Sequence, residues 1–512
     1  MNRMVGLILA TAALAGCTIN PVTGERELAL VSATDEVAIG QAQYFPSQQM
    51  QGGDYVRDPA LTQYVNEVGQ KLAAVSDRAL PYEFVVLNSS VPNAWALPGG
   101  KIAVNRGLLV ELESEAELAA VLGHEIVHAA ARHGAQAMQR GLLLQGAVLI
   151  AATATRNDDY SGLAVGAAGI GAQLINQRNG REAELEADLY GMRYMSRAGY
   201  DPQAAVSLQE TFVRLSKSNA EQGWLAGLFA SHPPSDERVA RNRETAATLP
   251  RAGELGQERY AAATAPLRRA QGAYETYDRA RMALMEDDVA NAESLAREAA
   301  GLVPNEGHFH ALLGDIDFER DRFADAVNHY QDAIASNGQY FYYRLRKGMA
   351  HQRLNQWDEA QSSLQASLDL LPTADAYYGL GVIAERRGDR AGALESYRQA
   401  ATSAGPAGQA AQEAVVRLDL PANPGQYVAL RTGVDAAGQL IVEVGNPTRV
   451  PIADIAVIVR YTDPQGTVRQ TRRVLPGPLP PDGTQRWATG LGPFASSQSY
   501  EAAIESARAV SQ

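Results

Sequence analysis

Residues 123–132 read GHEIVHAAAR and hold His124, Glu125 and His128 in an H-E-x-x-H spacing. Residues four apart on an α-helix share one face, so the two imidazoles can bind a single metal ion. The glutamate between them can then reach a water molecule on the open side of that metal. Because the chain has only 8 histidines, the number of H-E-x-x-H matches expected by chance in the whole sequence is on the order of 0.01. The spacing therefore predicts a metal site.

The residues before this stretch favour a helix. Ser114 followed by Glu117 is typical of a capping box at a helix N-terminus. An apolar stripe then runs along one face of the expected helix through Leu118, Val121, Leu122 and Ile126. His133 falls half a turn out of phase with His124, and we interpret it as a surface or packing residue.

A catalytic metal site needs a third protein ligand and one position left for water. Residues 181–188 read REAELEAD and provide candidates. Glu184 and Asp188 are four residues apart, so the first could bind the metal while the second orients a ligating histidine. Spacing alone does not distinguish Glu184 from Glu182 or Glu186.

The N-terminal segment 1–16 has an apolar run that ends in Leu14-Ala15-Gly16-Cys17. The run is too short for a permanent membrane span and has the form of a cleaved export signal. The Leu-Ala-Gly-Cys sequence resembles a bacterial lipoprotein box, which implies lipidation of Cys17. Since Cys17 is the only cysteine, an internal disulfide and a cysteine-based zinc cluster are excluded. Thr18, in place of the aspartate that retains lipoproteins at the inner membrane, implies the outer membrane, facing the periplasm.

The length of 512 residues predicts two to four domains. A net charge of −13 argues against nucleic acid as a partner, because phosphate binding needs a basic surface.

Residues 17–270 are expected to form a catalytic domain. Amphipathic helices are predicted over Glu36–Tyr44 and Asp58–Val75, and short strands over Tyr82–Leu87 and Lys101–Asn105. The stretch Val91–Ile102 leads into the last strand. It is either an edge strand that binds substrate backbone or an ordinary hairpin, and spacing does not separate the two.

These motifs together resemble the Ste-twenty-four/HtpX class of zinc metalloproteases, and within it the soluble periplasmic, BepA-type members. The resemblance covers residues 30–250 and rests on H-E-x-x-H, on E-x-x-A-D at 184–188, and on Ser231-His232-Pro233-Pro234 with Arg238. It implies an α+β zincin domain of the gluzincin type. It also implies one Zn²⁺ held by His124, His128 and Glu184, with Asp188 and Arg238 behind the ligands and His232 near the metal.

The mechanism that follows is metal-assisted peptide hydrolysis. Zinc lowers the pKa of its bound water to about 7 and polarises the scissile carbonyl, while Glu125 moves the proton from water to the leaving amine. Arg238 and Tyr190 could each donate to the oxyanion, and the sequence assigns this role to neither. His232 is either a fourth ligand that keeps the enzyme latent, which we favour, or a donor to the transition state.

Two apolar segments, Leu142–Ala154 and Leu163–Ile175, fall where membrane members of this class carry transmembrane hairpins. Each has about a dozen residues, short of the ~20 that a spanning helix needs. We interpret them as buried or membrane-contacting helices.

Residues 271–405 contain an internal repeat. Gly314, Gly348 and Gly381 are 34 and 33 residues apart, and small and bulky residues keep the same offsets at Ala326, Ala360, Ala393, Tyr330, Leu364 and Tyr397. Ala292 marks a weaker first unit. The pattern resembles the tetratricopeptide repeat, an α-helical solenoid with a groove for peptides or partner proteins. Aromatic residues that could line this groove are Tyr340, Tyr342, Tyr343, Trp357, Tyr377 and Tyr378.

Residues 421–512 are predicted to form a small β-sandwich. Alternating apolar and polar residues predict strands over Leu440–Val444, Ile452–Tyr461 and Thr467–Val474. Asp463-Pro464-Gln465-Gly466 reads as the hairpin turn between the last two.

Two functional hypotheses follow. In the first, the chain is a zinc endopeptidase that degrades misfolded or stalled envelope proteins recruited by the repeats. In the second, it is a chaperone or assembly factor for outer-membrane proteins with a largely latent protease, and the repeats contact the assembly machinery. The intact H-E-x-x-H motif favours the first hypothesis.

Overall fold

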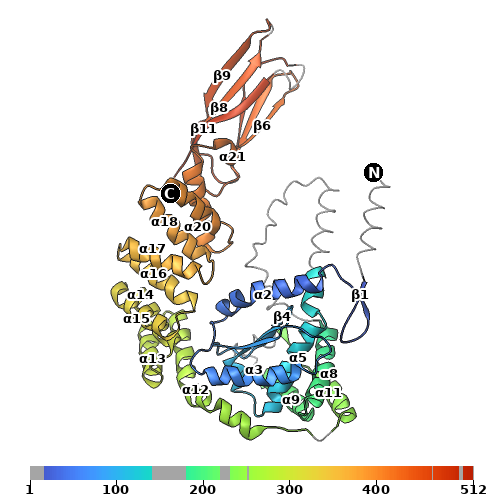
Figure 1. Ribbon diagram of the computed structural model, residues 1–512. Coiled ribbons are helices and arrows are strands. Elements are labelled where there is room, and N and C mark those ends of the chain that lie inside the picture. Colours follow the sequence, from blue (N-terminus) through green and yellow to red (C-terminus); the bar gives the residue numbers. More distant parts are fainter. Residues whose placement is uncertain are drawn as a thin grey trace. The chain divides into compact units, whose positions relative to one another are not determined.

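The computed structural model describes residues 17–140, 180–218, 231–250, 253–463, 465–494 and 500–510. The predicted signal segment 1–16 and the apolar segments 142–154 and 163–175 lie outside these residues. In the part of the chain that is described, no helix is long and apolar enough to cross a membrane. The chain divides into two compact units, residues 1–343 and 344–512, and each is described by itself (Figure 1).

The first unit begins with strands and helices around one small sheet. Its elements are β1 (Cys17–Ile19), β2 (Arg26–Leu28), α2 (Ala33–Met50), α3 (Pro59–Ala73), β3 (Glu83–Leu87), β4 (Ala94–Leu97), β5 (Lys101–Asn105), α4 (Arg106–Leu109), α5 (Glu115–Ala130), α8 (Arg181–Arg197), α9 (Gln203–Ser218), α11 (Asp236–Thr248), α12 (Gln257–Met285), α13 (Val289–Leu302), α14 (Gly307–Glu319) and α15 (Phe323–Ser336). The helices and strands predicted before residue 106 are confirmed, with ends that differ by a few residues.

The sheet has the order β3-β5-β4, in which β5 is parallel to β3 and antiparallel to β4. Side chains alternate between its two faces. On one face Trp95 packs with Tyr44 of α2, while on the other Phe84, Val86 and Val104 join the core that α3 and α5 complete. The 91–105 stretch is thus a hairpin, and its first strand, β4, also lies at the edge of this sheet.

Helix α5 is buried along its whole length. Ser114 caps it by accepting a hydrogen bond from the Glu117 N–H at 3.1 Å. The predicted capping box is only half formed, because the Glu117 carboxylate accepts from the Glu113 N–H at 2.6 Å instead of from the Ser114 N–H. The helix ends at Ala130, and Arg132, with a φ of 66°, turns the chain back.

Helices α5 and α8 approach each other closely, and a glycine of each helix lies at the contact. A Cβ built on Gly191 would lie 3.0 Å from the backbone nitrogen of His124 and 3.1 Å from the carbonyl carbon of Gly123. A Cβ on Gly123 would in turn lie 3.1 Å from the Gly191 carbonyl oxygen. Both obstacles are backbone atoms, which cannot rotate away as a side chain could. The two backbones therefore touch beside the H-E-x-x-H segment.

Helix α12 and the helices that follow it form antiparallel pairs, as the repeat predicts. Within the first unit α12 packs on α13 and α14 on α15. A Cβ on Gly314 would meet the ring of Tyr330 at 2.7 Å, and in the second unit Gly348 faces Leu364 and Gly381 faces Tyr397 at 2.8 and 2.5 Å. The repeat spacing thus pairs each small residue with a bulky one, and the predicted helical repeat is confirmed.

The second unit combines the remaining helices with two small sheets. Its elements are α16 (Phe341–Arg353, which starts at the end of the first unit), α17 (Trp357–Leu368), α18 (Ala374–Arg386), α19 (Arg390–Ala400), α20 (Pro406–Asp419), α21 (Pro424–Tyr427), β6 (Ala429–Val434), β7 (Leu440–Gly445), β8 (Ile452–Thr462), β9 (Val468–Val474), β10 (Thr484–Ala488) and β11 (Tyr500–Ala509). The antiparallel sheets have the orders β10-β7-β6 and β11-β8-β9, and side chains of both meet in one apolar cluster.

The three strands predicted in this region are present as β7, β8 and β9, and Asp463 closes the turn by accepting from the Gly466 N–H at 2.9 Å. Strands β6, β10 and β11 were not predicted. Their sequences, ALRTGV, TQRWA and YEAAIESARA, are rich in alanine and polar residues, so the alternation of apolar residues is weak.

We predict that Gly191→Ala destabilises the first unit by about 1–3 kcal/mol, because the added methyl group forces α5 and α8 apart. Gly272→Ala is the matched control, since Gly272 is exposed in α12 and a Cβ there meets no atom within 4 Å. That variant should be neutral or more stable by up to about 1 kcal/mol, as alanine favours a helix. Thermal unfolding measures both, and equal stability of the two variants would contradict the close packing.

Candidate metal centre

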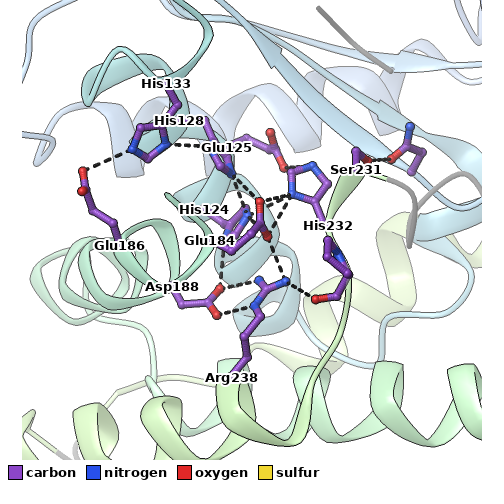
Figure 2. A network of polar contacts seen from close by, with 12 residues as sticks. His124, Glu125, His128, His133, Glu184, Glu186, Asp188, Ser231, His232 and Arg238 are labelled. Atoms are coloured by element: carbon purple, nitrogen blue, oxygen red, sulfur yellow. Dashed lines mark hydrogen bonds and ion pairs between the residues drawn. The ribbon is translucent and has the colours of Figure 1, made fainter. Parts of the chain in front are cut away.

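Three segments bring the candidate residues together (Figure 2). Helix α5 supplies His124, Glu125 and His128. Helix α8 supplies Glu184 and Asp188 from its first turns, and α11 with the residues just before it supplies His232 and Arg238. In each case the side chain is buried by more than nine-tenths or nearly so.

Four of these side chains converge on one point. The Nε2 atoms of His124 and His128 lie 3.0 Å apart, and each is 3.4 Å from a Glu184 carboxylate oxygen. His232 Nδ1 lies 3.2 Å from His124 Nε2 and 3.1 Å from Glu184 Oε1. For a tetrahedral zinc ion with ligand bonds of 2.0–2.1 Å, ligand atoms are about 3.3 Å apart. The spacing of the four groups fits such an ion.

The chemistry of the donors also fits zinc. Imidazole nitrogens and a carboxylate oxygen are ligands that zinc accepts. The nitrogens of His124 and His128 face each other at a distance that is unfavourable for two lone pairs with no cation or proton between them. His124, His128, Glu184 and His232 are therefore the residues that could hold the ion.

A layer of ion pairs fixes the ligands from behind. The Nδ1–H of His124 donates to Asp188 Oδ1 at 2.9 Å, which leaves Nε2 free to face the metal point. Arg238 holds Asp188 in turn, with Nε and Nη2 each 2.7 Å from a carboxylate oxygen, and its Nη1 lies 2.9 Å from Glu184. Arg238 thus faces the two carboxylates, while Tyr190 packs against the apolar core and the guanidinium of Arg193.

His133 belongs to this network, so of its two interpretations the surface residue is wrong and the packing residue holds. It is buried, its Nδ1 lies 2.8 Å from His128 Nδ1, and its Nε2 lies 3.3 Å from Glu186. The helical phase used for the prediction does not apply, because α5 ends at Ala130 and the turn at Arg132 brings His133 back beside His128. The sequence carried no clear signal for this turn.

The charges of the cluster set its protonation. Burial acts to lower the pKa of His124, but the carboxylates of Glu184 and Asp188 outweigh it and raise that pKa to about 10. Burial acts to raise the pKa of Asp188, but Arg238 overcomes it and lowers the value to about 2. The pKa of Glu184 is likewise held well below its usual range by His232 and His124, in spite of burial. Both carboxylates are therefore ionised at neutral pH.

Glu125 is placed differently from the other acids. Its Oε1 lies 3.5 Å from His232 Nε2, and its Oε2 is buried without a hydrogen-bond partner among the described residues. Burial raises the pKa of this carboxyl. A buried carboxylate oxygen with no partner is unfavourable unless water or a substrate group binds it. Glu125 is therefore placed where it can exchange a proton with such a group.

A cavity of about 60 Å³ adjoins the cluster. His124, Glu125 and His232 line one side, and Ala94 of the edge strand β4 lines another. The rest of the wall is mostly apolar and includes Leu108, Val121, Met192, Met195, Leu208 and Phe212. The cavity can take an apolar side chain beside the metal point.

We predict that the affinity of this cluster for zinc rises with pH. Without metal, His124 carries a proton below its pKa of about 10, and a metal ligand must be neutral. Binding therefore releases a proton, and each unit of decrease in pH weakens the apparent affinity about tenfold. Chelator competition between about pH 6 and pH 8, with His124→Ala as background, measures the effect. An affinity that stays constant over this range would contradict it.

Comparison with known families agrees with this geometry. Residues 59–246 match Peptidase family M48, and residues 345–411 match the tetratricopeptide repeat. The chain therefore carries an M48 peptidase domain and, after it, tetratricopeptide repeats.

Several relatives are similar to part of the chain. A beta-barrel assembly-enhancing protease of Yersinia pestis is 31% identical over 234 residues, which are 44% of this chain and 46% of the relative. The protein of the same name in Escherichia coli K12 is 30% identical over 223 residues, 38% and 44% of the two chains. The mitochondrial metalloendopeptidase OMA1 of Schizosaccharomyces pombe is 35% identical over 185 residues, 36% and 52%. The chain thus spans about half the length of the relatives it matches.

Proposed function

We propose that this protein is a zinc-dependent endopeptidase that cleaves misfolded or stalled proteins of the bacterial envelope. The observation that carries the proposal is the convergence of His124, His128, Glu184 and His232 on one point, with ligand atoms 3.0–3.4 Å apart and Glu125 beside them. The match to an M48 peptidase domain supports the reaction class.

Each residue of the site has its own role in the proposed hydrolysis. A zinc ion at the cluster would supply an activated water and polarise the scissile carbonyl. Glu125 accepts the proton of that water at its unpartnered Oε2 and delivers it to the leaving amine, and its raised pKa suits both transfers. Asp188 and Arg238 keep His124 and Glu184 in position. The roles of these residues are part of the proposal.

The substrate enters as an extended chain in this proposal. Strand β4 lies at the edge of its sheet and contributes Ala94 to the cavity wall beside Glu125. An edge strand can pair with a peptide backbone, while side chains of the peptide enter pockets. The apolar cavity beside the cluster would take one such side chain.

His232 would act as a gate. Its Nδ1 occupies the fourth corner of the ligand set, at 3.1–3.3 Å from Glu184 and His124. Four protein ligands close a zinc site, whereas catalysis needs one position for water. His232 precedes α11 in the segment Ser231-His232-Pro233-Pro234, so its withdrawal would need only a local movement. The enzyme is then latent until a substrate or partner displaces this histidine.

A large cavity in the first unit is the proposed docking groove. Its volume is about 1410 Å³, and it is bordered by the residues after β3, by α12 and by α14. Tyr340, Tyr342 and Tyr343, predicted as groove residues, line it together with Met282 and Met285, which are exposed. Flexible methionines and aromatic rings suit varied apolar segments. The groove would hold part of an unfolded chain while another part reaches the cluster.

The remaining assignments follow the sequence. We assign residues 1–16 to a lipoprotein signal peptide, 17–270 to a metalloprotease domain with a gluzincin-type zincin fold, 271–405 to the repeats and 421–512 to a β-sandwich. Lipidation at Cys17 would anchor the protein to the outer membrane, facing the periplasm. The protein-binding character of tetratricopeptide repeats supports a partner in outer-membrane protein assembly.

The second candidate function is an assembly factor with a mostly silent protease. Relatives such as those of Yersinia pestis and Escherichia coli carry the name beta-barrel assembly-enhancing protease, and the closed set of four ligands favours a latent site. The two functions are compatible, because a gate at His232 allows one protein to do both. They differ in whether the biological activity needs Glu125.

We predict that Glu125→Gln abolishes nearly all cleavage of an unfolded protein but keeps the fold and one zinc at the cluster, because the amide cannot accept the proton. Glu117→Gln is the matched control, since Glu117 is buried on the same helix and its side-chain oxygen can still accept from the Glu113 N–H. Cleavage at the wild-type rate by Glu125→Gln would refute the mechanism. If this variant lost cleavage but kept the biological activity, the assembly function would be favoured.

We predict that His232→Ala increases cleavage of unfolded protein and retains zinc, because three ligands remain and the fourth position opens to water. The double variant His232→Ala/Glu125→Gln is the control, and its inactivity would assign the added cleavage to this site. A fall of about a hundredfold with zinc retained would instead make His232 a transition-state donor.

A further inference from the structure

A second cluster of potential metal ligands lies in the helical repeats. His310 belongs to α14, and His329 and Asp332 lie one turn apart on its partner helix α15. One ligand atom from each of the three lies within 4.8 Å of the others. Histidine and carboxylate side chains come together in this way at one other place in the described part of the chain, which is the cluster of His124, His128, Glu184 and His232.

The ring of His310 is oriented by a backbone carbonyl. Its Nε2 lies 2.6 Å from the oxygen of Pro304, so Nε2 carries the proton and donates. In the neutral ring Nδ1 is then a free acceptor. This atom is buried and has no hydrogen-bond partner among the described residues.

His329 also has an oxygen atom near Nε2, at a longer distance. Its Nε2 faces Asp317 Oδ2 at 3.5 Å, and Arg322 holds that aspartate from the other side at 2.6 Å. Its Nδ1 is also buried without a partner in the described structure. The two rings lie nearly parallel, with centroids 6.5 Å apart. In both rings Nδ1 thus lacks a partner in the described structure, while Nε2 of His310 donates to a carbonyl oxygen and Nε2 of His329 faces a carboxylate.

This orientation is that of metal-binding histidines, which donate their second N–H to a carboxylate or a backbone carbonyl. Two buried acceptors without donors are unfavourable unless a cation or a water molecule binds them. Asp332 is exposed and one turn from His329, so its carboxylate can rotate to complete three ligands and leaves the outer side open to solvent. A nitrogen-rich set with one carboxylate prefers zinc and similar transition metals over calcium or magnesium.

We propose that His310, His329 and Asp332 form a second metal site, which binds a divalent transition metal of the zinc type and links α14 to α15. The site is structural in character. Helix α14 also lines the large groove through His308, Ala311, Leu312 and Asp315, so the metal would stabilise one wall of that groove. The proposal does not depend on peptidase activity, because its ligands and its effect lie outside the H-E-x-x-H cluster.

The test counts zinc in the full chain. In a Glu125→Gln background, which prevents self-cleavage, the protein dialysed against zinc should hold two ions, and His329→Ala should hold one. Asp332→Asn, a mild change at an exposed position, should weaken the second ion about tenfold or more. Asp325→Asn is the matched control, because it removes another exposed carboxylate from α15 and should leave two ions.

Thermal unfolding gives a second readout. In a His124→Ala/His128→Ala chain, added zinc should still raise the unfolding temperature of the first unit, and His329→Ala should remove this shift, because only the folded repeat binds the ion. Two results would overturn the proposal. The first is two bound ions in the His329→Ala variant. The second is only one bound ion with His329 intact, together with no zinc-dependent thermal shift in the His124→Ala/His128→Ala chain. The second result would mean that water satisfies the two imidazoles.

Discussion

The backbone contact between Gly123 and Gly191 sets the geometry on which the metal centre depends. Helix α5 carries two of the convergent side chains and α8 carries the third, so the separation of these helices fixes the distance between His128 and Glu184. Any side chain at Gly191 would meet the backbone of His124 itself. The distances of 3.4 Å from Glu184 to His124 and to His128 thus depend on a packing constraint that lies one residue from the first histidine.

Close packing also brings negatively charged side chains together, and Arg238 behind the metal ligands compensates their charge. Glu184 and Asp188 are ionised and buried, which would be very unfavourable in isolation. Arg238 contacts both carboxylates and is itself positioned by the start of α11, where Ser235 caps the helix. One guanidinium therefore neutralises the acids and orients His124 through Asp188. A cation at the centre would complete this balance.

The sequence predicted the parts of the site that local periodicity controls. The spacing of His124 and His128 predicted a common face, and the repeat offsets predicted paired helices, which the structure contains. It could not choose among Glu182, Glu184 and Glu186, because that choice depends on how α8 is rotated against α5. The contact of His133 with His128 was not predicted, because the positive φ of Arg132 ends the helical phase. Strand β11 was missed because its alanine-rich sequence has a weak pattern, and the strand forms by pairing with β8, which lies far away in sequence.

The small size of strand β4 has a consequence for selectivity. It has four residues and pairs only with β5 among the described strands, so it offers a few backbone hydrogen bonds on its free side. A folded protein has already paired its own strands and presents no such partner, whereas a chain that has lost its structure does. Recognition at this edge would therefore depend first on whether a polypeptide is unfolded, and only then on its amino-acid sequence. The short length of the edge also limits stable pairing between two copies of the chain, which longer exposed edges promote.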